Sequence, residues 1–138
     1  MNEEHQVQRA CVTWFRIQYP ELRRMLFAVP NGSRRTVWEQ RQAMEEGMVS
    51  GVADLVLSVP RGGYGALFIE MKKESEVWKG GKRTVTRGYQ SKAQKEWQAD
   101  AERHGNRYVV CHSLDEFMTA VNGYLRDGNG ARPIVKAG

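Results

Sequence analysis

Two acidic residues and a lysine near the middle of the chain have the types and spacing of a metal-binding hydrolytic site. Asp54 lies within an apolar run, GVADLVLSV (51–59), and Glu70 and Lys72 end a second run, GALFIEMK (65–72). Successive side chains of a strand point to opposite faces, so Glu70 and Lys72 share one face. A carboxylate and an ammonium group at the end of an apolar strand suggest a role other than packing.

The turn between the two runs brings Asp54 to the same face. The intervening PRGGY has the composition of a tight turn, which predicts an antiparallel hairpin. If the turn centres on Gly62, Asp54 lies opposite Glu70; if it centres on Gly63, Asp54 lies opposite Lys72. Both registers place the two carboxylates on one face, where like charges repel. A divalent cation would compensate this charge, and oxygen ligands suit Mg²⁺ or Mn²⁺.

A simpler interpretation of the same residues needs no metal. Lys72 alone can neutralise Glu70 as an ion pair at the end of a strand, which is a common arrangement at protein surfaces. This interpretation gives no reason for Asp54 to share the face on the neighbouring strand.

A third carboxylate lies near the start of the chain. The N-terminal segment has helical periodicity, and Glu4 continues the stripe Val7, Cys11 and Trp14 that would pack on the sheet. Its neighbour Glu3 lies on an overlapping stripe, so the choice between the two acids stays open. The alternative is an acidic first turn that complements the helix dipole.

Gln94 has two interpretations of equal weight. It follows Ser91 by three residues in SKAQ, the spacing of a capping box, in which its side chain bonds back to the backbone of Ser91. The predicted helix 91–105 also follows a basic segment, so its first turn could point at the acidic pair.

Positive charge is concentrated directly after the acidic pair. The chain has a net charge of +5, and the segment 72–95 alone has +6, from eight basic and two acidic residues. Such a segment indicates a partner that carries phosphates, although lysines that keep a loop soluble are an equal alternative on charge alone. Trp78 and Tyr89 are interleaved with these cations, and they either stack on unpaired bases or pack on the edge of the domain.

Together these features fit the hydrolysis of phosphodiester bonds. A metal on the acidic pair would polarise a phosphoryl oxygen and lower the pKa of a bound water. Lys72 would orient that water or stabilise charge in the transition state. The basic segment would neutralise backbone phosphates, which gives an affinity that depends on salt and little on base sequence.

The surrounding sequence predicts a mixed α/β domain in the order αβαββαβα, with a mobile loop or short hairpin at 73–90. Strands that are apolar throughout imply a central sheet covered by helices on both faces. The expected helices span 3–19, 36–46, 91–105 and 113–125, and the expected strands span 25–29, 51–59, 65–72 and 107–111.

Length and composition set further limits. The chain has 138 residues, the size of one domain, which we place at 1–126 with a loose tail at 127–138. No apolar run approaches the roughly 18 residues of a membrane span. The two cysteines lie far apart without metal-ligand spacing, which predicts a reducing, cytoplasmic location.

A series of short motifs resembles the virus-type replication-repair nuclease (VRR-NUC) domain of the PD-(D/E)XK nuclease superfamily. The aspartate and EMK pattern alone has low specificity, but the whole series covers about residues 4–125 and is specific in combination. One position departs, since the proline usual before the aspartate is Ala53 here; that proline is a backbone feature, not a ligand. The motifs are EHQVQ (4–8), PNG (30–32), GMVSGVADL (47–55), FIEMK (68–72) and SKAQKEW (91–97).

The resemblance implies a restriction-endonuclease-like core, with a mixed sheet of about four to five strands, and DNA cleavage that depends on Mg²⁺ or Mn²⁺. It implies that Glu4, Asp54 and Glu70 are metal ligands, that the backbone carbonyl of Met71 is a further ligand, and that Lys72 is the catalytic lysine.

The resemblance also implies that Gln94 belongs to the active site, and it places Asn31 and Gly32 in a turn beside that site. Contacts with DNA are expected from six basic residues: Lys73, Lys79, Lys82, Arg83, Arg87 and Lys92.

Family members with this domain alone resemble phage-encoded or bacterial enzymes, and some are similar to homodimers that cut branched DNA such as four-way junctions. The resemblance therefore implies a structure-selective endonuclease of replication, repair or recombination that acts on junctions or flaps as a homodimer. A dimer is physically reasonable, because one small domain offers little area to grip a junction and two related sites can cut opposing strands.

Two other functions compete with the enzyme. A catalytically silent nucleic-acid-binding module would have lost part of the acid–acid–lysine set, and all three members are present. A metal-free interaction domain would require the shared face of Asp54 and Glu70 to be accidental. The sequence therefore favours the enzyme.

Overall fold

The computed structural model describes residues 3–30 and 36–127, and its elements follow the expected order with a short 3₁₀ helix and two further strands added. The elements are α1 (Glu3–Gln18), η1 (Pro20–Leu22), β1 (Leu26–Ala28), α2 (Val37–Glu45), β2 (Leu55–Leu57), β3 (Leu67–Met71), β4 (Glu74–Lys79), β5 (Lys82–Arg87), α3 (Lys92–Arg103), β6 (Arg107–Cys111) and α4 (Leu114–Asp127).

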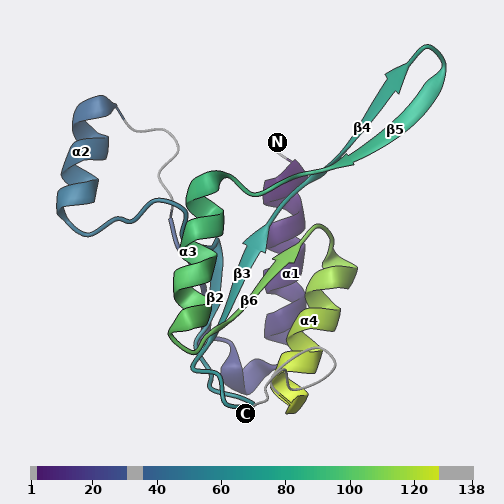
Figure 1. The fold of residues 1–138 in the computed structure, drawn as a ribbon. Coiled ribbons are helices and arrows are strands. Elements are labelled where there is room, and N and C mark those ends of the chain that lie inside the picture. Colours follow the sequence, from purple (N-terminus) through teal and green to yellow (C-terminus); the bar gives the residue numbers. More distant parts are fainter. Residues whose placement is uncertain (1–2, 31–35, 128–138) are drawn as a thin grey trace.

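Four strands form the central sheet in the order β1-β2-β3-β6 (Figure 1). β2 pairs antiparallel with both β1 and β3, whereas β3 and β6 pair in parallel. Parallel neighbours need a long crossover connection, and α3 provides it here. The predicted fold class is confirmed: a mixed four-stranded sheet flanked by helices, consistent with a restriction-endonuclease-like core.

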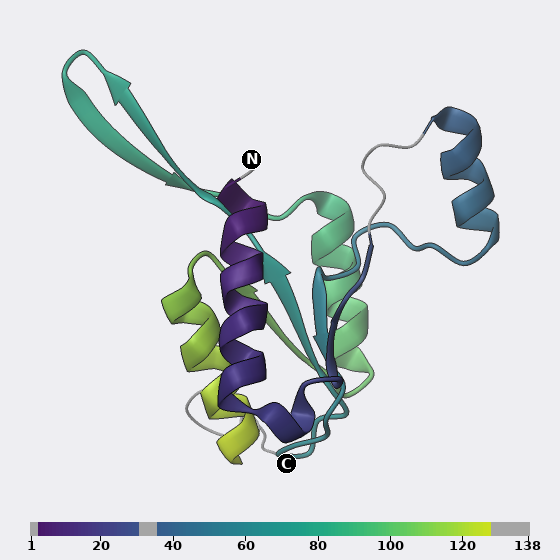
Figure 2. The ribbon, with the colours of Figure 1, turned by 180° about the vertical axis from the view of Figure 1, so that it is seen from behind.

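Helices cover both faces of this sheet (Figures 1 and 2). The larger hydrophobic cluster lies on the face covered by α1 and α4, where Cys11 and Phe15 of α1 meet Phe117 of α4 and Ile69 of β3. The helical stripe expected in the N-terminal segment therefore packs on the sheet. Cys11 and Cys111 are both buried and free, and burial raises the pKa of each thiol to about 12.

A smaller cluster lies on the opposite face, under α3. Trp97 and Ala101 of α3 pack with Phe68 of β3 and Tyr108 of β6. Because side chains alternate along a strand, Glu70 shares the face of Phe68 and points toward α3. The polar end of β3 thus lies on the same face of the sheet as the smaller cluster.

β2 is shorter than the sequence predicted. The expected strand was 51–59, and only Leu55–Leu57 form it. Gly51 has a φ angle of +87°, and a Cβ atom at this position would lie 2.3 Å from the carbonyl oxygen of Ala93 in α3. The chain before Asp54 leaves the extended conformation because it passes directly against the first turn of α3, and only glycine fits there.

The segment predicted as a mobile loop or a short hairpin is a hairpin, which we call the arm (residues 74–87). β4 and β5 pair only with each other, as a separate two-stranded sheet. Gly80 and Gly81 have φ angles of +58° and +79°, as a two-residue hairpin turn requires. The arm projects away from the body of the domain beyond the end of β3 (Figures 1 and 2).

α2 also stands apart from the sheet (Figures 1 and 2). Thr36 and Glu39 form a capping box at its start, and Gly47 follows its end with a φ angle of +111°. The helix has no buried residue, and its Val37 and Trp38 are 80% and 67% exposed. The local sequence of α2 therefore determines where the helix begins and ends, but none of its side chains is buried in a hydrophobic core.

The predicted domain boundary at 126 falls within the last turn of α4, which ends at Asp127. The rest of the predicted tail, 128–138, lies outside the described residues. None of the helices in the described ranges combines the length and the apolar character that crossing a membrane would take.

Candidate active site

The end of β3 and the start of β2 bring Asp54 and Glu70 together. β2 and β3 pair Leu55 with Ile69. One step further, this register places Asp54 opposite Glu70, the first of the two registers that the sequence allowed. The backbone N–H of Met71 donates a hydrogen bond of 2.7 Å to Oδ2 of Asp54. Asp54 is therefore anchored to the strand that carries Glu70 and Lys72.

Glu70 is a buried carboxylate, with 0% of the residue exposed. Its Oε1 accepts a hydrogen bond of 2.5 Å from the hydroxyl of Tyr108 and one of 3.0 Å from Nε2 of Gln90. Its Oε2 is buried without a hydrogen-bond partner among the described residues. Nζ of Lys72 lies 3.5 Å from this oxygen as an ion pair. One oxygen of Glu70 is thus fully engaged, and the other faces only the lysine.

This burial decides against the simple surface ion pair. A buried charge is costly unless it is paired and hydrogen-bonded. Lys72 forms an ion pair with Glu70 in the described structure. Asp54, which accepts the backbone N–H of Met71, brings a second carboxylate to the same end of β3.

Tyr108 remains a hydrogen-bond donor across the accessible pH range. Burial raises the pKa of its hydroxyl far above the ordinary value, and the hydrogen bond to Glu70 and the charge of that carboxylate raise it further. The phenol therefore stays protonated beside Glu70. Trp97, whose ring lies 6.0 Å from the ring of Tyr108, packs against it within the smaller cluster.

Gln90 is a site residue that the sequence reasoning missed. It lies directly before the N-cap of α3, Ser91. Its Nε2 donates both to Glu70 and, at 2.8 Å, to Oε1 of Gln98, whose own amide donates to Glu102 at 3.2 Å. A polar side chain of α3 therefore fixes the rotamer of Gln90. The only signal in the sequence was its position in the basic segment, directly before a strong helix N-cap.

Lys72 is held at the junction between the sheet and the arm. Its side chain is 20% exposed, and its backbone N–H donates to the carbonyl oxygen of Cys111 at 2.9 Å. Gly88, at the foot of the arm, lies against it: a Cβ atom at Gly88 would be 3.3 Å from the Cβ of Lys72. The lysine is therefore partly enclosed, with a path to solvent.

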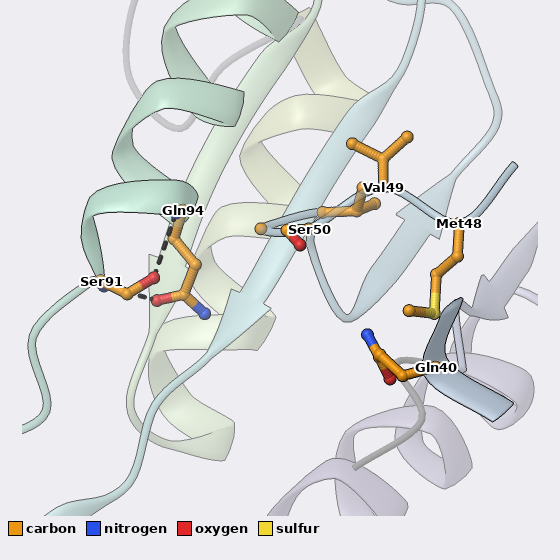
Figure 3. A pocket seen from close by; sticks show the side chains of 8 residues that line it. Gln40, Met48, Val49, Ser50, Ser91 and Gln94 are labelled. Atoms are coloured by element: carbon orange, nitrogen blue, oxygen red, sulfur yellow. Dashed lines mark hydrogen bonds between the residues drawn. The ribbon is translucent and has the colours of Figure 1, made fainter. Parts of the chain in front are cut away.

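Gln94 adopts the capping geometry. Its Oε1 accepts the N–H of Ser91 at 2.8 Å, and the N–H of Gln94 donates to Oγ of Ser91 at 3.1 Å. Its amide nitrogen is turned toward a pocket between the first turn of α3 and the loop before β2 (Figure 3). The pocket is lined by Gln40, Met48, Val49, Ser50, Gly51, Val52, Ser91 and Gln94. The capping interpretation is confirmed, and the role of Gln94 in the active site stays a prediction.

Other predicted site residues are placed only in part. Glu4 lies in the first turn of α1, but its side chain and that of Glu3 lie outside the described residues, as do Asn31 and Gly32. Within the described ranges no three His, Cys, Asp or Glu side chains gather as a metal cluster. The acids placed at the site are therefore the pair Asp54 and Glu70.

The chemistry of the placed groups fits a hard divalent cation. Asp54 and Glu70 offer carboxylate oxygens, including the unpartnered Oε2 of Glu70. The N–H of Met71 points to Asp54, and because the N–H and C=O of one residue of a strand point to the same side, its carbonyl is expected on the β2 side of β3; its role as a ligand stays a prediction. Few oxygen ligands with the remaining positions left to water and phosphate are typical of Mg²⁺ and Mn²⁺.

The predicted DNA-contacting residues lie on the arm and beside it. The side chains of Lys73, Lys79, Lys82, Arg83 and Lys92 are exposed, and that of Arg87 lies outside the described ones. Trp78 and Tyr89 are 64% and 82% exposed. Both residues are too exposed to pack on the edge of the domain, and their stacking on unpaired bases stays a prediction.

Comparison with known proteins supports this architecture. No family model matches the sequence, and no curated protein matches it. A solved structure described as a "VRR_NUC domain protein" matches with a TM-score of 0.73 and 24% identity, over 94% of this chain and 93% of that one. At this level of identity the likeness establishes the fold: the chain has the VRR-NUC fold, as the motifs predicted.

Proposed function

We propose that the protein is a divalent-metal-dependent deoxyribonuclease that hydrolyses phosphodiester bonds in branched DNA, such as four-way junctions or flaps. The observation that supports this most directly is Glu70, a buried carboxylate with one oxygen held by Tyr108 and Gln90 and the other facing only Lys72. Asp54 is anchored to the same strand, so two carboxylates stand together at this end of the sheet. The name of the structural neighbour, which designates a VRR_NUC domain, points to a nuclease-type domain.

Each residue of the site has a role in this proposal. Asp54, Glu70 and the carbonyl of Met71 would hold Mg²⁺ or Mn²⁺, with Glu4 as a further ligand. The bound metal would supply the charge that polarises the phosphoryl group and lowers the pKa of the attacking water. Lys72 forms an ion pair with the oxygen of Glu70 that accepts no hydrogen bond, and it would stabilise the charge that develops on the phosphoryl oxygens. Gln94 would contact substrate through the amide nitrogen that faces the pocket.

The substrate part of the proposal rests on the arm. Its exposed basic residues would follow the phosphate backbone, which by itself favours any nucleic acid. A projecting hairpin that starts two residues after Lys72 suits a substrate that surrounds the site on more than one side. Branched DNA has this shape, and acting on it would place the protein in replication, repair or recombination.

We also propose that two copies assemble into a dimer through β1 and α2. β1 is an edge strand of the sheet, with Phe27 48% exposed. α2 presents Val37 and Trp38 to solvent and buries no residue in the monomer. An exposed apolar helix face and an open strand edge are each typical sites of association, and a second copy would cover both. Two sites in one dimer could cut opposing strands.

A cleavage assay tests the catalytic proposal. Labelled four-way junction, flap, single-stranded and linear duplex DNA are incubated with Mg²⁺, with Mn²⁺ and with EDTA, using wild type and Asp54→Ala. We expect metal-dependent cleavage of branched DNA by wild type alone, with binding retained in the variant. Binding without cleavage by either protein would favour the silent module, and equal rates on duplex and junction would contradict the structural preference.

The dimer is tested by measuring the molar mass in solution. Wild type should have twice the mass of the chain at micromolar concentration, and Trp38→Asp on α2 should reduce it. The matched control is Trp78→Asp on the arm, which alters an equally exposed tryptophan outside the proposed interface. A monomeric wild type would reject this assembly.

A further inference from the structure

The outer half of the arm has two different faces. The arm pairs Trp78 with Arg83 and, next to the turn, Lys79 with Lys82. Directly opposed residues of a hairpin share a face, and consecutive pairs alternate between faces. One face therefore carries an aromatic ring opposite a guanidinium group, and the other carries two ammonium groups opposite each other.

The stability of the arm does not explain the pair of lysines, and it does not require the exposure of Trp78. Like charges directly opposite each other destabilise a strand pair, so Lys79 and Lys82 weaken the tip unless an anion lies between them. Trp78 is 64% exposed, and no residue from 78 to 84 is buried. An isolated two-stranded hairpin is marginal in water, and the aromatic ring of this one is mostly exposed. Both features suit a surface that is completed by a partner.

We propose that the tip of the arm binds DNA at a branch point, where Trp78 and Arg83 stack on an unpaired base and Lys79 and Lys82 together bind a backbone phosphate. The proposal deepens the proposed function and rests on its substrate being DNA. Aromatic and guanidinium planes stack on bases with little regard to sequence, whereas paired duplex offers no exposed base face. The arm would therefore recognise the branch and not the base sequence.

The length of the arm gives the distance between the branch and the cut. Each strand has six residues, and at roughly 3.3 Å per residue the tip lies about 20 Å from the foot beside Lys72. That length corresponds to roughly six base pairs of duplex, at about 3.4 Å per pair. We therefore expect cleavage about that far from the branch, and a longer or shorter arm should move the cut.

Binding assays without divalent metal separate this proposal from catalysis. A four-way junction with 2-aminopurine at the branch point reports stacking through quenched fluorescence, and a linear duplex of the same length is the reference. Trp78→Ala should weaken junction binding about 5- to 150-fold, which corresponds to the roughly 1–3 kcal/mol of one base–aromatic stack, and should abolish the quenching. Trp78→Phe should restore most of both, and duplex binding should change less than twofold.

Ile17→Ala is the matched control, because it removes an exposed large apolar side chain on α1, outside both the arm and the proposed dimer interface. Equal losses on junction and duplex, or the same loss from Ile17→Ala, would overturn the proposal for the arm. Normal cleavage together with unchanged junction binding by Trp78→Ala would overturn it while leaving the nuclease standing. Quenching at the branch by a wild type that cleaves nothing would retain the arm and reject the nuclease.

A separate observation supports a second inference, on the geometry of Glu70. Oε1 of this carboxylate accepts two hydrogen bonds, from Tyr108 at 2.5 Å and from Gln90 at 3.0 Å, and Oε2 accepts none among the described residues. Gln90 is itself held by Gln98 at 2.8 Å. We infer that Tyr108 and Gln90 are positioning residues that direct Oε2 toward the metal, so that Glu70 binds through one oxygen only.

Manganese binding tests this inference without cleavage. Outer partners of metal ligands typically contribute 10- to 100-fold in affinity, and Tyr108→Phe should weaken Mn²⁺ binding by about that factor in calorimetry. Tyr124→Phe is the control: its buried hydroxyl donates to the carbonyl oxygen of Val59 at 2.6 Å, within the cluster on the opposite face of the sheet. It should lose similar stability and keep Mn²⁺ affinity. Unchanged affinity in Tyr108→Phe would reject the positioning role, whereas no binding by wild type would also reject the metal site.

Discussion

The site at the end of β3 and the arm beyond it are neighbours in sequence but opposite in construction. Glu70 is buried and bonded to residues 38 and 20 positions away, Tyr108 and Gln90. The arm pairs only with itself, and each of its residues from 78 to 84 is exposed. The site is held in place by residues from distant parts of the chain, whereas the arm is held by the hydrogen bonds between its own two strands.

This difference corresponds to the two tasks of the proposed enzyme. Catalysis requires groups held within fractions of an ångström, which burial and mutual hydrogen bonds achieve. Recognition of a branched polymer tolerates, and benefits from, an element that can adapt its position. If this division is correct, substitutions in the site should change rate, and substitutions in the arm should change binding.

The largest effect is expected from a pair of adjacent lysines. Lys72→Ala should lower kcat about 10²- to 10³-fold, because it removes the ammonium group beside the phosphoryl position, and should leave KM little changed. Lys73→Ala, one residue closer to the arm and exposed, should raise KM with kcat nearly unchanged. Single-turnover cleavage at several DNA concentrations separates the two constants. If both substitutions changed kcat and KM in the same way, the division of tasks between the site and the arm would be wrong.

A glycine pair tests how strongly the fold holds the site. A Cβ atom at Gly51 would lie 2.3 Å from a backbone oxygen of α3, whereas one at Gly47 would have open space, and both residues have positive φ angles. Gly47→Ala should therefore destabilise the protein by about 1–2 kcal/mol from backbone strain alone, and Gly51→Ala by clearly more. Urea unfolding measures both. Equal losses would mean that the approach to α3 is not tight.

Neutralising the arm should change salt dependence more than rate. Replacing Lys79, Lys82 and Arg83 by Ala should reduce the slope of log affinity against log salt by about 1, since the two lysines share one phosphate, Arg83 stacks on a base, and each phosphate contact contributes about 0.9. kcat at saturating DNA should stay within about twofold, because the site does not depend on the arm tip. Fluorescence anisotropy at several salt concentrations gives the slope. An unchanged slope would show that these cations do not contact phosphates.

The sequence predicted what depends on local pattern. Periodicity predicted the helices, and the PRGGY turn allowed the register that places Asp54 opposite Glu70. The motif SKAQ predicted the capping box at the start of α3. These features follow from spacing along the chain, with partners a few residues away or directly across a turn. The basic segment was also visible as a count of charges.

What the sequence did not predict depends on distant parts of the chain. The hydrogen bonds of Gln90 and Tyr108 to Glu70 arise only when α3 packs on the sheet, and nothing in either local sequence marks them. The predicted start of β2 at residue 51 was wrong for the same reason, since Gly51 has a positive φ angle where it passes close to the backbone of Ala93 in α3. The sequence also did not predict that the basic segment projects from the domain as an arm. Its polar residues are compatible with a hairpin but do not determine where that hairpin lies relative to the sheet.

The last prediction concerns the place where the two regions touch. A Cβ atom at Gly88 would lie 3.2 Å from the carbonyl oxygen of Lys73 and 3.3 Å from the Cβ of Lys72, so these neighbours would have to shift by tenths of an ångström. Gly88→Ala should therefore lower kcat by about threefold to tenfold, since small displacements of catalytic groups are costly, while junction affinity stays within twofold. Gly81→Ala at the tip, with open space around it, is the matched control and should spare kcat. A loss of affinity without a loss of rate in Gly88→Ala would show that this glycine serves the arm alone, and that the site is isolated from it.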